Sequence, residues 1–151
     1  MRAPDQAHLT ALLKRALVGF AVGVLLLALL TGTRGGPFYA IPGGALSGTV
    51  VDERVEDWSF VSDQNLDLET RPDRPYSVEL NYVVQDGQLF IDPAEGRTWF
   101  DHIRADPRVR VRFGDRIYPL YAVLVGRPGE LEGFPEDRFV YRLDPRPGSS
   151  E

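Results

Sequence analysis

The sequence predicts a mainly β domain, a small barrel with one or two short helices, preceded by a single transmembrane helix. Three observations support this prediction. Residues 16–33 carry no charge, the residues after position 45 show repeated runs of alternating apolar and polar side chains, and residues 97–105 form one clear helical pattern. Two helices are too few to cover both faces of a parallel sheet, so a small barrel is favoured over a doubly wound fold.

The N-terminal apolar stretch is predicted to be a membrane anchor. As a helix, residues 16–33 would be about 27 Å long, close to the roughly 30 Å hydrocarbon core of a bilayer. Arg2, Lys14 and Arg15 precede the stretch and only Arg34 follows it closely, an arrangement that places the N-terminus in the cytoplasm. The remainder would then be extracytoplasmic, in the periplasm if the cell has two membranes. A cleaved signal peptide is the alternative interpretation.

These boundaries divide the chain into five parts. Residues 1–15 are a cytoplasmic segment, 16–33 the anchor, 34–45 a Gly/Pro-rich linker, 46–147 the barrel domain and 148–151 a tail. About 100 residues are enough for one small domain with its own core, but not for two.

The first half of the domain contains several candidate strands. Leu46–Val51 and Asp57–Val61 are the first two, and Leu66–Thr70 alternates strictly between apolar and polar residues. Two prolines make residues 71–75 a loop. Tyr76–Val84 and Gln88–Asp92 then flank Gln85-Asp86-Gly87, a strong signal for a hairpin because glycine tolerates the positive φ of the turn.

The second half begins with a helix predicted at Arg97–Ala105, with Trp99, Phe100 and Ile103 on one face. Pro107 ends this helix. Arg108–Phe113 follows as a strand with three arginines on one face and three apolar residues on the other.

The last predicted elements follow a turn at Gly114-Asp115. Ile117–Val125 is a long strand in which Pro119 indicates an edge or a bulge. Pro135–Leu143 is predicted to be a short amphipathic helix.

Composition excludes several kinds of site from the domain. The chain has no cysteine, and Lys14 is its only lysine, so a thiol nucleophile and a Schiff-base lysine are both excluded there. His102 is the only histidine beyond the anchor, which leaves no His-rich metal site. The net charge of −5 argues against general nucleic-acid binding.

The order of these elements resembles the split β-barrel flavin-binding family, which includes pyridoxamine-phosphate-oxidase-like proteins and deazaflavin-dependent nitroreductases. In the second group a hairpin precedes a Trp-bearing short helix, then an N-L-x-x-x-P-x-V run and a strand. Residues 99–109, W-F-D-H-I-R-A-D-P-R-V, occupy the corresponding place, and residues 71–78, R-P-D-R-P-Y-S-V, resemble the Arg-containing approach to the family's central strand. The resemblance covers about Leu46 to Val125.

The resemblance implies a split β-barrel that binds FMN or a deazaflavin, works as a homodimer and is a candidate oxidoreductase. Backbone N–H groups at the start of the helix, with an arginine and a hydroxyl, suit a cofactor phosphate. The candidate cofactor-binding residues are Arg74, Tyr76, Gly96, Arg97, Thr98, Trp99 and Arg110.

Each of these residues also has a structural interpretation. Arg97 would pair with Glu95 or Asp101, and the arginines at 108, 110 and 112 would form a solvated face or meet anionic lipid headgroups. Trp58 and Trp99 would be core residues rather than surfaces on which a flavin ring stacks. Tyr118 would line the cavity with Tyr76 or stay outside it. His102 would be a solvated surface histidine.

Two other functions compete with flavin binding. A cofactor-free split barrel would serve as an interaction module of the cell envelope, an outcome expected if the short Asp92–Arg97 loop closes the cofactor cleft. A lipid or hydrophobic-ligand carrier would require a large apolar cavity inside the barrel.

Overall fold

The computed structural model describes residues 14–24, 35–38 and 41–146. The chain divides into two compact units, Met1–Arg34 and Gly35–Glu151. In the first unit, residues 14–24 are helical. Among the described residues, no helix is both long enough and apolar enough to cross a membrane. Residues 25–33 of the predicted anchor lie outside the described residues.

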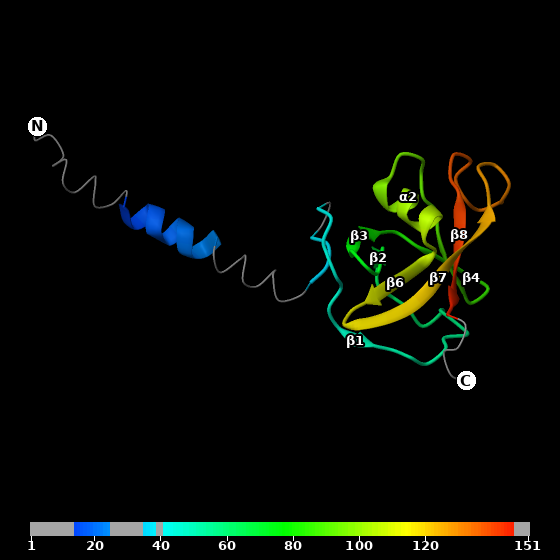
Figure 1. Ribbon diagram of the computed structural model, residues 1–151, viewed down its shortest axis with the longest axis horizontal. Coiled ribbons are helices and arrows are strands. Elements are labelled where there is room, and N and C mark those ends of the chain that lie inside the picture. Colours follow the sequence, from blue (N-terminus) through cyan, green and yellow to red (C-terminus); the bar gives the residue numbers. More distant parts are fainter. Residues whose placement is uncertain (1–13, 25–34, 39–40, 147–151) are drawn as a thin grey trace, which may run out of the picture. The chain divides into compact units, whose positions relative to one another are not determined.

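The second unit is a curled sheet with one described helix (Figure 1). The sheet has the order β3-β2-β6-β7-β8-β5-β4, and β1 pairs in parallel with β7 beside this path. The elements are β1 (Thr49–Val50), β2 (Leu66–Thr70), β3 (Tyr76–Leu80), β4 (Val83–Gln85), β5 (Gln88–Ile91), α2 (Thr98–Ala105), β6 (Arg108–Phe113), β7 (Arg116–Gly126) and β8 (Val140–Pro145).

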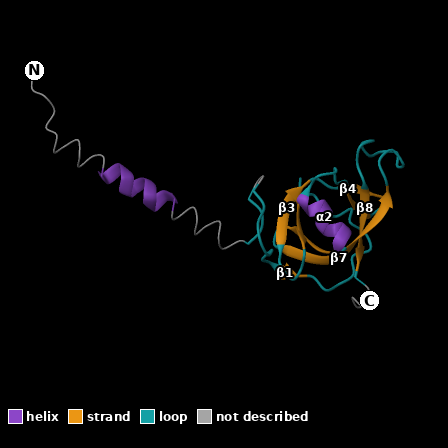
Figure 2. Cartoon of the chain, turned by 45° about the horizontal axis from the view of Figure 1, so that its top comes forward, coloured by secondary structure: helices purple, strands orange, loops and turns teal. Residues whose placement is uncertain are grey.

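The connection between the two edge strands requires the sheet to curl. Laid flat, seven strands at about 4.8 Å spacing would place the edges roughly 29 Å apart. Only Asn81 and Tyr82 separate β3 from β4, which allows roughly 10 Å. The edges are therefore brought together in a half-barrel, and Figure 2 shows α2 lying across its open end. The prediction of a small barrel is confirmed to the extent that the sheet curls into a half-barrel.

Several local predictions are confirmed. The predicted strands at 66–70 and 108–113 match β2 and β6, and the predicted helix differs from α2 by one residue. The hairpin turns at Asp86-Gly87, where φ is 51° and 73°, as a two-residue turn of type I′ requires. Leu46–Val51 contains a strand only at Thr49–Val50, and Tyr76–Val84 is divided between β3 and β4.

The prediction that Pro119 marks an edge or a bulge is right only for a local edge, because no bulge lies there. Pro119 lies inside β7, opposite Arg110 of β6, and the register shift falls instead between Leu124 and Gly126. The neighbouring Ile117 carbonyl accepts a hydrogen bond from Val51, so the Pro119 nitrogen points to the same side, away from β6. On that side, pairing with β1 stops at Ile117 and pairing with β8 begins at Leu120, so no ladder N–H is needed at Pro119.

Two predicted elements are wrong. In the predicted helix at Pro135–Leu143, residues 135–139 form a turn and irregular structure, and the residues from Val140 belong to strand β8, which lies between β7 and β5. Its buried aromatic and β-branched residues suit a central strand, and this tertiary pairing prevails over the helical pattern. Asp57–Val61 is a turn, because the Asp57 carboxylate accepts the Ser59 N–H at 2.8 Å and the Trp58 N–H donates to the Gly87 carbonyl at 2.8 Å.

The concave face of the sheet holds the hydrophobic core. Phe100 and Ile103 of α2 are 2% exposed and pack onto the side chains of β2, β6, β7 and β8. Trp58 is also 2% exposed, and its ring centroid lies 5.1 Å from that of Tyr118 and 6.0 Å from that of Phe113. Trp58 and Tyr118 are therefore core residues.

Candidate functional site

An open groove of about 570 Å³ lies beside the N-terminal end of α2. This volume is in the usual range for small-molecule sites. Five of the seven predicted site residues line it: Tyr76, Gly96, Arg97, Thr98 and Trp99. The other lining residues are Ile41, Pro42, Val78, Glu79, Leu80, Asn81, Asp92 and Arg138.

The first turn of α2 faces this groove without a side-chain cap. Arg97 is the N-cap residue, and its side chain makes no hydrogen bond to the helix. The first N–H groups of a helix lack partners within the helix, and they carry partial positive charge. Arg97 is exposed and forms no ion pair within the described part of the chain, so the predicted pairing with Glu95 or Asp101 is absent there. The Phe100 N–H donates to the Arg97 carbonyl at 2.9 Å, so the N–H groups of Thr98 and Trp99 are the backbone donors without a partner among the described residues, and they lie next to the Arg97 cation.

A second arginine, Arg138, reaches the groove from the segment before β8. One of its terminal nitrogens donates to the Asp92 carbonyl at 3.1 Å. Its Nε is buried without a hydrogen-bond partner among the described residues and lies 3.5 Å from Asp137 Oδ1. Sequence reasoning missed Arg138 because the segment containing it was predicted as a helix; no local motif marks it.

Two carboxylates share the groove with these arginines. Burial raises the pKa of Asp92, opposed by the positive charge of Arg138. Glu79 accepts a hydrogen bond from the Asn65 amide at 2.7 Å. The lining is therefore mixed in charge, with Arg97 as its exposed cation.

Two aromatic residues add flat surfaces to the groove. Trp99 is half-buried, lines the groove and also packs against the core, so its structural and ligand-facing interpretations are compatible. Tyr76 is half-buried at the start of β3. Trp58 and Tyr118 do not line this groove.

The arginines of β6 are engaged elsewhere, on the convex face of the sheet. Arg110 makes a bidentate ion pair with Glu69, which is only 2% exposed. Arg112 pairs with Asp67 at 2.6 Å. Arg110 is therefore outside the groove.

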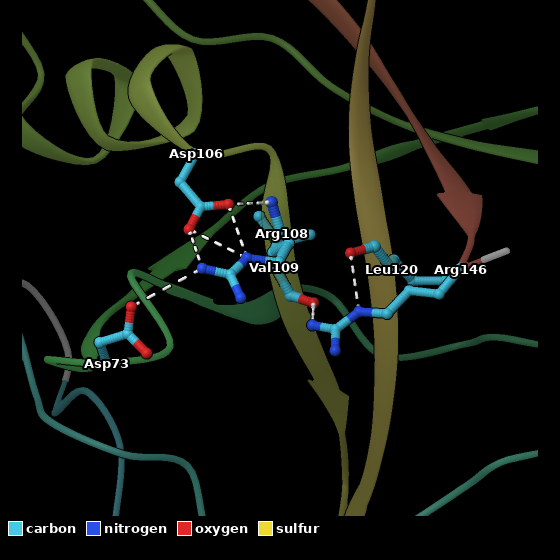
Figure 3. A network of polar contacts seen from close by, with 6 residues as sticks. All are labelled: Asp73, Asp106, Arg108, Val109, Leu120 and Arg146. Carbon is cyan, nitrogen blue, oxygen red and sulfur yellow. Dashed lines mark hydrogen bonds and ion pairs between the residues drawn. The ribbon is translucent and has the colours of Figure 1, made fainter.

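Arg108 belongs to a separate network near the end of α2. Its guanidinium pairs with Asp106 at 2.6 Å and lies 3.7 Å from Asp73 (Figure 3). Arg146 donates to the carbonyls of Val109 and Leu120 beside it. The three arginines of β6 were predicted to form a solvated face, but each of them is paired with a carboxylate.

His102 is not the solvated histidine that was predicted. Its Nε2 lies 3.1 Å from a terminal nitrogen of Arg71, and its Nδ1 lies 3.0 Å from Thr70 Oγ1. Arginine can only donate, so Nε2 accepts and Nδ1 carries the proton that is donated to Thr70. Thr70 in turn donates to the Tyr76 carbonyl at 3.2 Å. This chain of hydrogen bonds connects α2 to β2 and β3 through neutral His102.

Protonation of His102 is expected to destabilise the domain. Burial lowers its pKa from 6.5, and the positive charges of Arg71 and Arg74 lower it further, against the opposing effect of Asp101. The neutral form therefore contributes stability above pH 6.5, and that stability is lost as pH falls from 6.5 towards the lower folded-state pKa. Urea unfolding from pH 8 to pH 5 should show a steeper loss for the natural protein than for His102→Gln. Identical pH profiles would contradict this role.

Arg74 lies in the turn between β2 and β3, where its N–H donates to the Arg71 carbonyl at 2.9 Å. Its side chain is exposed, and it does not line the groove. The structure therefore groups five predicted site residues, and it places Arg74 and Arg110 apart from them.

Comparison of the sequence with protein-family models and with curated proteins gives no match. The resemblance to the split-barrel flavin-binding family stays a prediction.

Proposed function

We propose that the groove beside α2 binds a flavin-type cofactor, FMN or a deazaflavin, through its phosphate, and that the protein is a candidate oxidoreductase. The observation that carries this proposal is Arg97, an exposed cation at the uncapped start of a helix, in a groove that also contains Trp99. A bound flavin supplies hydride-transfer chemistry, and the protein holds and orients it.

The donors in the groove suit a phosphate-bearing ligand. Arg97 offers a planar guanidinium, Thr98 a hydroxyl, and Thr98 and Trp99 their backbone N–H groups. Trp99 and Tyr76 offer faces for a flat ring. The short loop from Asp92 to Arg97 contributes lining residues to an open groove, which favours ligand binding over the cofactor-free interaction module.

Bilayer attachment and dimerisation remain proposals of the same account. The described helical residues 14–24 expose several large apolar side chains: Leu17, Val18, Phe20, Val22 and Val24. These side chains suit contact with lipid, as does the uncharged composition of residues 16–33. Retention of the full chain in membranes after alkaline washing would support attachment, and its release would contradict it. Sedimentation of the full chain would test for a homodimer.

Arg97→Ala is expected to weaken FMN binding roughly 10- to 100-fold, because a charge-assisted hydrogen bond contributes about 1.5–3 kcal/mol. Titrations of the full chain followed by flavin absorbance measure this loss. Arg74→Ala is the matched control, because Arg74 is an exposed arginine outside the groove. The affinity of Arg74→Ala for FMN should equal that of the natural protein. Absence of binding by the folded natural protein to both FMN and a deazaflavin would contradict the proposal and favour the interaction module.

A further inference from the structure

The segment from Ile41 to Gly48, called the strap here, connects the groove to the convex face of the sheet. Its first two residues, Ile41 and Pro42, line the groove. Leu46 lies at the other end and is 5% exposed. The segment predicted as a linker, residues 34–45, is thus in part a wall of the candidate site.

Backbone hydrogen bonds hold the strap against the edge strand β3. Gly43 and Ser77 exchange two of them, each 2.9 Å long. Ser77 is flanked in sequence by Tyr76 and Val78, which both line the groove. The strap therefore continues the sheet at the point where the wall of the groove begins.

The strap also contacts the residues before it and the charged groups of the convex face. Ile41 and Phe38 exchange two backbone hydrogen bonds, 3.0 and 3.1 Å long. The Leu46 N–H donates to Glu69 Oε2 at 2.6 Å, and Arg112 donates to the Ser47 carbonyl at 3.0 Å. Glu69 also pairs with Arg110, so this buried carboxylate connects the strap to β6. Hydrogen bonds and one buried leucine hold the strap.

Two features indicate that the strap can be released without unfolding the sheet. Leu46 is its one buried residue, and segments with few buried apolar contacts open at low free energy. The hydroxyl of Ser77 is fully buried in the closed arrangement and has no hydrogen-bond partner among the described residues. A buried hydroxyl without a hydrogen-bond partner costs free energy, and release of the strap would remove this cost by exposing the hydroxyl to water.

We infer that the strap is a releasable wall of the groove, closed by the Gly43–Ser77 pair and by the Leu46–Glu69 hydrogen bond. A ligand that contacts the closed wall stabilises closure, and closure raises the affinity for that ligand to the same extent. This coupling between ligand binding and closure rests on the proposed cofactor site. Release of the strap in the free protein does not rest on it.

Gly43→Ala tests the inference, with Gly44→Ala as the matched control. A Cβ at Gly43 would lie 2.0 Å from the Gly36 carbonyl oxygen, whereas a Cβ at Gly44 would meet nothing within 4 Å. Amide hydrogen exchange of the full chain is read at Gly43 or its replacement, at Leu46 and at Ser77. These three N–H groups report release because they donate the hydrogen bonds that join the strap to β3 and to Glu69.

Without ligand, Gly43→Ala should accelerate exchange at Leu46 and Ser77 roughly tenfold or more, a loss of about 1.4 kcal/mol in closure, and leave Val111 in β6 unchanged. Gly44→Ala should match the natural protein. Unchanged exchange in Gly43→Ala, or equal acceleration at Val111, would overturn the inference.

A second arm uses saturating FMN. Slower exchange at Leu46 and Ser77 is expected with ligand bound. Binding that depends on Arg97 but leaves these amides unprotected would overturn the coupling while the proposed function stands. If FMN does not bind, the proposed function fails, and the ligand-free arm alone decides whether the strap is releasable.

Discussion

Glu69→Ala is expected to lower the free energy of unfolding by about 3–5 kcal/mol, the usual cost of leaving one partner of a buried ion pair alone. The Glu69 side chain is 2% exposed and Arg110 is 28% exposed. The alanine variant would leave the Arg110 guanidinium without its carboxylate, and it would leave the Leu46 N–H without an acceptor. Urea unfolding of the full chain, followed by the near-ultraviolet signal of the domain, measures this loss.

Glu56→Ala provides the control for this prediction. Arg54 and Glu56 form an ion pair at 2.7 Å, but both side chains are largely exposed, so its loss should change stability by less than about 1 kcal/mol. Glu69→Gln retains an acceptor for the Leu46 N–H and should fall between the two. A cost below about 1 kcal/mol for Glu69→Ala would show that the strap and β6 do not depend on this carboxylate.

Trp58→Ala is also expected to lower the free energy of unfolding, by about 3–5 kcal/mol, because it removes an indole from the core. The Trp58 ring contacts those of Phe60, Phe113 and Tyr118. Phe60→Ala is the matched control, since Phe60 belongs to the same cluster but is 59% exposed; its loss should be about 1 kcal/mol. Equal losses for the two variants in urea unfolding would contradict the assignment of Trp58 to the core.

Local signals in the sequence predicted the elements that depend on local physics. The alternation in β6 is strong because its apolar face is buried along its whole length, and Pro107 fixes the end of α2. The Asp86-Gly87 turn needs positive φ at both residues, which this pair supplies. Five of the seven predicted site residues line the groove because they lie close together at the start of α2 or at the start of β3.

Most of the failures concern long-range pairing. β8 has an amphipathic pattern that also fits a helix, and only its place between β7 and β5 decides for a strand. Pro119 is tolerated within β7 because the pairing of β1 ends before the pairing of β8 begins. Arg138 and the strap reach the groove through tertiary contacts across more than thirty positions of sequence, which no local pattern encodes.

The most direct test of the account compares FMN with riboflavin, which lacks the phosphate, on the natural full chain and on Arg97→Ala. If Arg97 binds the phosphate, the natural protein should prefer FMN roughly 10- to 100-fold. The variant should lose most of that preference, and its affinity for riboflavin should be unchanged. An equal loss of affinity for both ligands, or no preference for FMN in the natural protein, would contradict the assignment of the groove beside α2 as a flavin-phosphate site.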